Sequence, residues 1–229
     1  MSPIAANLQA IRRRISEALQ GDSRDVGLVA VSKARDPEAL REALRAGCRD
    51  FGENYVQEAL PKIAALAGSG ARWHFIGPLQ GNKARDVAES FDWFHALDRA
   101  KIAVALSRHR PAGRAPLEVC IQVNISREAT KSGVEPGQAL GLAREIAALP
   151  GIRLRGVMGI ASPSGEPAQQ RREFASLRAV LEQLKKEGFE VDTLSMGMTQ
   201  DFEAAIAEGA TLLRIGTAIF GERQKQAVA

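Results

Sequence analysis

The sequence is poor in cysteine, in aromatic residues and in long apolar runs. Its 229 residues include two cysteines, and aromatic residues make up 5% of the chain. Cys48 and Cys120 are far apart and belong to no CxxC or Cys/His cluster, which argues against a zinc site and for a reducing compartment. No run approaches the roughly 18 apolar residues needed to span a bilayer. The first residues lack the apolar core of a signal peptide, so we expect a cytoplasmic protein with no membrane partner.

Charge and missing motifs exclude further classes of protein. The formal net charge is +4. No basic tract is interleaved with aromatic residues, so we expect no nucleic-acid partner. A solvated basic surface explains the charge, and a site for an anionic ligand is the alternative. The sequence has no P-loop, HExxH or GxGxxG pattern and no recognisable Ser/His/Asp triad, so the common signatures of nucleotide binding and hydrolysis are missing.

Short apolar runs rich in β-branched residues alternate with helical patterns along nearly the whole chain. Apolar residues at helical spacing predict a leading helix over residues 4–19. Asp36 and Pro37 mark the start of a second helix, and a third, from about Tyr55, is expected to kink or split at Pro61. Further helices are predicted after the turn at 81–82 and over 99–109, 138–149, 174–187 and 201–208. The strand-like runs cover residues 28–33, 50–53, 73–77, 93–97, 117–125, 154–161, 193–196 and 212–215.

This order of elements predicts the fold. Strands separated by helices imply a parallel sheet, and eight strands close a (β/α) barrel of about this length. We therefore predict an α/β fold: a (β/α)8 TIM barrel with an extra N-terminal helix, formed by residues 1–229 as a single domain. An open doubly wound sheet is the main alternative.

Lys33 stands at the end of the first predicted strand. In a parallel barrel, binding sites form at the C-terminal ends of the strands. Lys33 directly follows a run that looks buried, so its amine either extends to solvent along the apolar stem or lies at the barrel mouth. At the mouth, partial desolvation lowers the pKa of a lysine and frees its amine as a nucleophile for a Schiff base.

Two glycine-containing turns follow the last two strands. They hold Gly197, Met198 and Thr199 after the seventh strand, and Gly216 and Thr217 after the eighth. Glycine allows close approach of the backbone, and free N–H groups form a site for an anion such as phosphate. Plain turns between a strand and a helix are the alternative. A phosphate site after strands seven and eight is nevertheless common in such barrels.

Arg214 lies on the eighth predicted strand and needs a partner if it is buried. A structural ion pair with Glu53 or another strand carboxylate is one explanation, and contact with a ligand is the other. His74, between Trp73 and Phe75, is by itself more typical of a hydrogen-bonded core histidine than of a catalyst.

Six segments, in order along nearly the whole chain, form one recognisable set. They are LVAVSK (28–33), FGENYVQE (51–58), WHFIGPLQGNK (73–83), VNISREATKSG (123–133), LSMGMTQDFEAAI (194–206) and RIGTAIFG (214–221). Together they resemble the pyridoxal phosphate homeostasis proteins, which are single-domain relatives of the alanine racemase N-terminal barrel.

The resemblance implies roles for individual positions. Lys33 would hold pyridoxal 5′-phosphate (PLP) as a Schiff base, and Arg214 would face the pyridine nitrogen. Thr199 replaces the serine that is usual in the LSMGMS motif but keeps a hydroxyl for the phosphate. Lys131, in KSG, matches a further family lysine. The other cofactor-binding residues that the resemblance implies are Asn54, His74, Met198, Gly216 and Thr217.

The resemblance also implies a carrier of PLP and no enzyme. An arginine against the pyridine nitrogen favours the unprotonated ring and weakens it as an electron sink. Racemases of this fold take a second base from a tyrosine of a separate β domain, whereas the only tyrosine here is Tyr55 and the chain ends at Ala229. We therefore expect a monomer that stores PLP and delivers it to apoenzymes. A PLP-dependent racemase-like enzyme and a barrel that binds a sugar phosphate are the alternatives.

Overall fold

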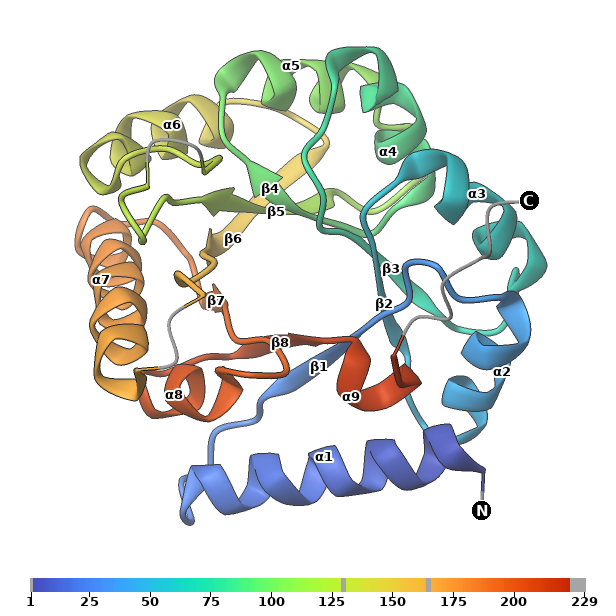
Figure 1. The fold of residues 1–229 in the computed structure, drawn as a ribbon. Helices are drawn as coiled ribbons and strands as arrows, with labels where there is room; N and C mark the ends of the chain where they lie inside the picture. Colours follow the sequence, from blue (N-terminus) through green and yellow to red (C-terminus); the bar gives the residue numbers. More distant parts are fainter. Residues whose placement is uncertain (1, 129–130, 164–165, 223–229) are drawn as a thin grey trace.

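Eight parallel strands close into a barrel with helices around it (Figure 1). The computed structural model describes residues 2–128, 131–163 and 166–222. Neighbouring strands pair in chain order, and β1 pairs with β8 to complete the circle. The predicted (β/α)8 barrel is thus confirmed, and the open sheet is wrong. The strands are β1 (Gly27–Val31), β2 (Asp50–Glu53), β3 (Arg72–Phe75), β4 (Trp93–Leu97), β5 (Leu117–Gln122), β6 (Ile152–Met158), β7 (Thr193–Ser195) and β8 (Leu212–Ile215).

The strand register brings the ends of β1 and β8 to the same edge of the barrel. Ala30 lies opposite Phe51 of β2 on one side and Ile215 of β8 on the other, and all three are fully buried. Both faces of a barrel strand are covered, which is why the strands read as apolar runs in the sequence. The residues that follow β1 and β8, including Lys33 and Gly216, therefore leave the barrel side by side.

The helices that start at Pro3 and Pro37 each have both a proline and a capping side chain in their first turn, and the helix that starts at Pro167 has a proline. Ser2 and Asp36 accept hydrogen bonds from the N–H groups of Ala5 and Ala39. The helices are α1 (Pro3–Leu19), α2 (Pro37–Arg45), α3 (Val56–Ala65), α4 (Ala84–Ser90), α5 (Ala100–His109), α6 (Ala139–Ala147), α7 (Pro167–Lys186), α8 (Phe202–Ala207) and α9 (Thr217–Phe220). Short 3₁₀ turns over Gly81–Lys83 and Pro136–Gln138 precede α4 and α6.

The extra N-terminal helix completes the outer ring. α9 follows β8 but has only four residues, too few to cover a strand. Figure 1 shows α1 in the ring between α8 and α2, beside β1 and β8. Its apolar face, with Leu8, Ile11 and Ile15, is buried. The helix predicted from apolar spacing therefore takes the place of a long eighth helix.

The expected split at Pro61 does not occur. α3 runs from Val56 to Ala65 with Pro61 inside it. Proline removes the N–H that would bond the carbonyl four residues earlier, at Gln57. Gln57 is exposed, so water can hydrogen-bond that carbonyl and the helix continues.

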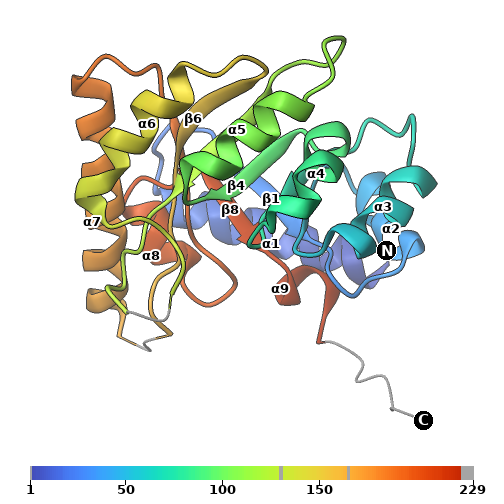
Figure 2. The same ribbon diagram turned by 90° about the horizontal axis from the view of Figure 1, so that it is seen from above.

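The two ends of the barrel differ. In Figure 2 the segments after β5, β6 and β8 leave the barrel on one side, which is the side of the C-terminal strand ends. We call this side the mouth. No helix in the described part of the chain is both long and apolar enough to cross a membrane.

Candidate functional site

The backbone around Lys33 is held on both sides. Lys33 follows β1 and is half-buried. Before it, the Ser32 carbonyl accepts a hydrogen bond from Lys62 Nζ at 2.8 Å. After it, the N–H of Ala34 donates to the Glu58 carboxylate. Ala34 has a φ of 57°, in the left-handed region that residues other than glycine adopt at a cost. The chain therefore turns sharply at Lys33 under constraints from α3.

A buried ion cluster lies behind this turn. Lys62 is 4% exposed and Glu53 is fully buried. Lys62 Nζ donates to Glu53 Oε1 at 2.8 Å and to Glu58 Oε1 at 2.6 Å. Ser32 Oγ donates to the same Glu53 oxygen at 2.6 Å. Burial raises the pKa of Glu53, even though Lys62 and Ser32 both favour its carboxylate. The cluster links the strand end that carries Lys33 to β2 and α3.

The turn after β8 lies against the same strand end. A Cβ at Gly216 would be 3.2 Å from the Val31 Cβ and 3.2 Å from the Val31 carbonyl oxygen, so this position favours glycine. Thr217 and Ala218 begin α9, where N–H groups have no helical acceptor. Within the described chain neither N–H has a backbone acceptor. Free donors are thus placed at the edge of the barrel that carries Lys33.

The turn after β7 has a structural reason for its glycine. Gly197 has a φ of 93°, and a Cβ there would be 2.7 Å from the Ala205 Cβ, so the turn packs closely on α8. The N–H of Met198 donates to Asp201 Oδ1 at 2.5 Å, which takes this amide out of reach of an anion. Thr199 is half-buried. Of the predicted residues in this turn, Thr199 keeps a polar group that it can offer to a ligand.

Arg214 is a buried cation whose contacts are with neutral groups. Its side chain is 5% exposed. Nη1 donates to Ser195 Oγ at 2.7 Å and Nη2 to the Gly159 carbonyl at 3.0 Å. Burial lowers the pKa of Arg214 to about 10, which leaves it cationic at neutral pH. The ion pair with Glu53 suggested by the sequence is wrong, because Glu53 pairs with Lys62, and Arg214 makes no ion pair within the described residues.

His74 lies deep in the barrel, toward the N-terminal strand ends. It is 2% exposed, and its ring stacks on Trp93 with the centroids 5.5 Å apart. Its Nε2 is 2.9 Å from Asp50 Oδ1, and its Nδ1 is 2.9 Å from His95 Nε2. His74 is thus the hydrogen-bonded core histidine that its sequence neighbours suggest, and the cofactor contact implied by the resemblance stays a prediction. Its inward side chain lies below the mouth, beside the first residues of β2 and β4.

His95 is the fully buried partner of His74. Its Nδ1 is 2.7 Å from Ser195 Oγ. Burial, followed by the charges of His74 and Arg214, lowers the pKa of His95 well below its usual 6.5. His95 therefore stays neutral in the folded protein as the pH falls below that value.

Replacing His95 by asparagine is expected to flatten the pH dependence of stability below about pH 6.5. In the unfolded chain His95 gains a proton as the pH falls, whereas in the folded protein it does not. The free energy of unfolding should therefore decrease with falling pH by up to about 1.4 kcal/mol per pH unit from this group alone. Urea unfolding at several pH values measures the slope. Identical slopes for wild type and His95→Asn would contradict the assignment.

A cavity of about 330 Å³ lies at the mouth, at the ends of β2, β3, β5 and β6. It is lined by Asn54, Ile76, Pro78, Gln122, Val123, Asn124, Lys131, Ser132 and Ile160. Asn54 Oδ1 is buried and has no hydrogen-bond partner within the described chain. An unsatisfied buried acceptor costs about 1–3 kcal/mol, so this atom points to a donor on a ligand or a water. Lys131 pairs with Glu128 at 2.8 Å on the cavity wall.

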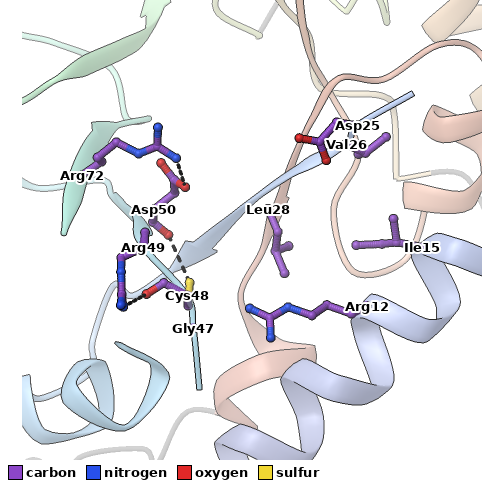
Figure 3. Close-up of a pocket in the computed structure, with 10 residues that line it drawn as sticks. All are labelled: Arg12, Ile15, Asp25, Val26, Leu28, Gly47, Cys48, Arg49, Asp50 and Arg72. Atoms are coloured by element: carbon purple, nitrogen blue, oxygen red, sulfur yellow. Dashed lines mark hydrogen bonds and ion pairs between the residues drawn. The ribbon is translucent and has the colours of Figure 1, made fainter. Parts of the chain in front are cut away.

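Further cavities open at the opposite end of the barrel. One of them, of about 390 Å³, lies beside α1 (Figure 3). On its wall Arg72 pairs with Asp50 at 2.7 Å. Its lining residues are Arg12, Ile15, Asp25, Val26, Leu28, Gly47, Cys48, Arg49, Asp50 and Arg72. A neighbouring cavity of about 430 Å³ shares Asp50 and Arg72 and also includes His74. His74 is the only predicted site residue that lines either of these two cavities.

Comparisons with known proteins identify the family. The family described as alanine racemase, N-terminal domain, matches residues 3–224. The pyridoxal phosphate homeostasis protein of Pseudomonas aeruginosa is 55% identical over 226 residues, which are 97% of each chain. That of Escherichia coli is 48% identical over 229 residues, 97% of this chain and 98% of that one. The chain belongs to the pyridoxal phosphate homeostasis protein family.

Solved structures agree with this family assignment. PipY from Synechococcus elongatus, solved without PLP, has a TM-score of 0.86 at 37% identity and covers 95% of this chain and 100% of its own. A PipY structure with PLP bound has a TM-score of 0.83 at 36% identity, with the same coverage. Alanine racemase from Corynebacterium glutamicum has a TM-score of 0.71 at 19% identity over 98% of this chain and 62% of its own. At that identity the likeness shows that the two chains have the same barrel fold.

Three buried residues behind the candidate site, Lys62, His95 and Ser195, were not predicted from the sequence. Lys62 stands at a buried position of α3, three residues after buried Ala59 and six after buried Val56. A lysine in an apolar helix stripe is a readable sign of a buried ion pair. His95 alternates with Trp93 along β4 and so points to the same face of the strand. Ser195 carries no such sign.

Proposed function

We propose that this chain binds PLP as a Schiff base on Lys33, stores the cofactor and delivers it to apoenzymes without robust catalysis. The observation that carries the proposal is the placement of Lys33, half-buried beside the free N–H groups of Thr217 and Ala218. The names of the bacterial relatives and the PipY structure with PLP bound support it.

The residues at the mouth fit the parts of PLP. The N–H groups that begin α9 and the Thr199 hydroxyl suit a phosphate. Lys33 Nζ would condense with the aldehyde carbon and release one water molecule. Asn54 offers an unused acceptor to a hydroxyl donor. The backbone N–H of Met198 already donates to Asp201, so it is not available to the phosphate.

Arg214 sets the limits of the chemistry. When bound, PLP can supply an electron sink for reactions at an amino-acid carbon. Arg214 can donate hydrogen bonds but cannot accept them, so against the pyridine nitrogen it favours the unprotonated ring. Tyr55, the only tyrosine, has an exposed fraction of 63% and no hydroxyl partner in the described chain. Arg214 therefore weakens the electron sink, and the exposed Tyr55 has no partner in the described chain that would hold it as a second base. Rapid proton transfer on both faces of a substrate is thus not favoured.

Titration of the protein with PLP, and in parallel with pyridoxal, tests the proposal. PLP should produce the absorbance band of a lysine Schiff base. Pyridoxal, which lacks the phosphate, should bind at least about tenfold more weakly, because the free N–H groups at α9 have nothing to bond. No band with PLP, or equal affinities for the two aldehydes, would contradict the proposed site.

Two further measurements distinguish a carrier of PLP from a PLP-dependent enzyme. We expect the loaded protein to leave the optical rotation of a panel of L-amino acids unchanged and to activate a PLP-dependent apoenzyme. A rate of racemisation that Lys33→Ala abolishes would favour the racemase-like alternative.

We also propose that the protein acts in the cytoplasm as a monomer formed by residues 1–229 as a single domain. Cys48 and Cys120 are free and buried. Burial raises the pKa of Cys48 to about 11 and that of Cys120 to about 12, so both thiols stay protonated and poorly reactive. Light scattering during gel filtration should give the mass of one chain, and a dimer mass would contradict this.

A further inference from the structure

A line of five polar side chains crosses the barrel interior from one end to the other. Arg214 Nη1 is 2.7 Å from Ser195 Oγ, which is 2.7 Å from His95 Nδ1. His95 Nε2 is 2.9 Å from His74 Nδ1, and His74 Nε2 is 2.9 Å from Asp50 Oδ1. Ser195 and His95 are fully buried, and the Asp50 side chain is 16% exposed. The five residues come from β8, β7, β4, β3 and β2.

The hydrogen bonds in this line run in one direction. Arg214 can only donate, so Ser195 Oγ accepts its N–H. The Ser195 hydroxyl must then donate to His95 Nδ1, the one acceptor within its reach in the described chain. His95 is neutral, so its proton is on Nε2 and is donated to His74 Nδ1. His74 in turn carries its proton on Nε2 and donates to the Asp50 carboxylate.

The reverse direction leaves a buried group without a partner. If His95 donated from Nδ1, Ser195 would accept from both His95 and Arg214. Its own hydroxyl hydrogen, fully buried, would then have no acceptor within the described chain. Such a loss costs about 1–3 kcal/mol, so the direction from Arg214 to Asp50 is favoured.

This line of hydrogen bonds helps to stabilise the buried charge of Arg214. A buried cation without a carboxylate in contact is costly. The charge of Asp201 raises the pKa of Arg214 and so favours the cation. Aligned hydrogen bonds polarise one another in a low-dielectric interior, so the negative charge of Asp50 adds to this effect through the chain of hydrogen bonds. Burial alone would raise the pKa of Asp50, but hydrogen bonds from His74 and Arg72 outweigh it and keep the carboxylate charged.

We propose that Ser195, His95, His74 and Asp50 are positioning residues that fix the guanidinium of Arg214 in its orientation toward the bound cofactor. The proposal rests on the proposed function, in which Arg214 faces the pyridine ring. Two of its nitrogens are committed to Ser195 and Gly159, so the guanidinium cannot rotate while these bonds persist. Asp50, at the cavity beside α1, thereby contributes to a site at the opposite end of the barrel.

Nitrogen-15 NMR of histidine rings in the protein without added PLP tests the direction of the line. We expect both His95 and His74 to carry a proton on Nε2 and none on Nδ1. Ser195→Ala removes the donor to His95 Nδ1 and should shift the ring signals of both histidines. A proton on Nδ1 of either ring in the wild type would overturn the proposal.

Titration with PLP tests the consequence at Arg214. We expect Ser195→Ala to weaken PLP binding about tenfold and to move the absorbance maximum of the bound cofactor. Asp50→Asn, at the exposed end, should act in the same direction by about threefold. Asp192→Asn is the matched control, because Asp192 lines the same barrel end but pairs with Arg155, and it should bind like the wild type.

The outcomes separate this inference from the proposed function. If the wild type forms no Schiff base at Lys33, the proposed function fails, whatever the histidine tautomers are. If the wild type forms it, but Ser195→Ala and Asp50→Asn match Asp192→Asn in affinity and absorbance maximum, the positioning role is overturned and the proposed function stands.

Discussion

Replacing Lys33 by alanine is expected to abolish the Schiff-base absorbance band and to weaken PLP binding by about a hundredfold, or about 2.7 kcal/mol. The covalent bond is lost, whereas the donors at Thr217 and Ala218 and the guanidinium of Arg214 remain. Some binding through phosphate and ring should therefore persist. Absorbance titration and equilibrium dialysis measure the two effects separately.

Lys101→Ala is the matched control for this variant. Lys101 is an exposed lysine of α5, so its loss should leave both the band and the affinity within about twofold of the wild type. Lys131→Ala tests the second lysine near the mouth, which pairs with Glu128 on the cavity wall. A band that survives in Lys33→Ala and disappears in Lys131→Ala would move the Schiff base to the other lysine.

Replacing Lys62 by methionine is expected to give the largest loss of stability, about 3–5 kcal/mol. Methionine fills a similar volume but leaves Glu53 fully buried, with Ser32 as its only hydrogen-bond partner among the described residues. Glu58 and the Ser32 carbonyl lose the same donor. Because these groups fix the backbone on both sides of Lys33, the variant should also bind PLP more weakly. Urea unfolding gives the first effect and titration the second.

Two further variants make this result specific to the buried cluster. Lys185→Met removes an exposed lysine that pairs with Glu182 at 2.9 Å, and should cost at most about 1 kcal/mol. The double variant Lys62→Met with Glu53→Gln removes the unpaired charge and should recover part of the lost stability. A loss in Lys62→Met no larger than in Lys185→Met would show that the cluster does not stabilise the fold.

The barrel could be predicted from the sequence because its strands leave a local signal. β2, β4 and β8 begin and end at the expected residues, Asp50–Glu53, Trp93–Leu97 and Leu212–Ile215. Each is a short run of mostly buried residues between turns, and the alternation with helices gives the order of pairing. The position of α1 in the outer ring could not be predicted, because it depends on the shortness of α9 near the other end of the chain.

The partners of the buried charges could not be predicted, because they depend on three-dimensional distance. Glu53 and Arg214 are both buried and of opposite sign, yet Glu53 pairs with Lys62 of the next helix. Arg214 instead contacts a hydroxyl and a carbonyl, groups that no sequence pattern marks. The resemblance implies a cofactor contact for His74, whereas its depth in the barrel follows from the register of β3 against β2 and β4.

The most direct test of the central claim is reduction of the PLP-loaded wild-type protein with borohydride, followed by peptide mapping with mass spectrometry. Reduction converts a lysine Schiff base into a stable pyridoxyl adduct at the residue that formed it. The account predicts one adduct per chain, on the peptide that contains Lys33. An adduct confined to Lys131 or to exposed lysines, with Lys33 unmodified, would contradict it.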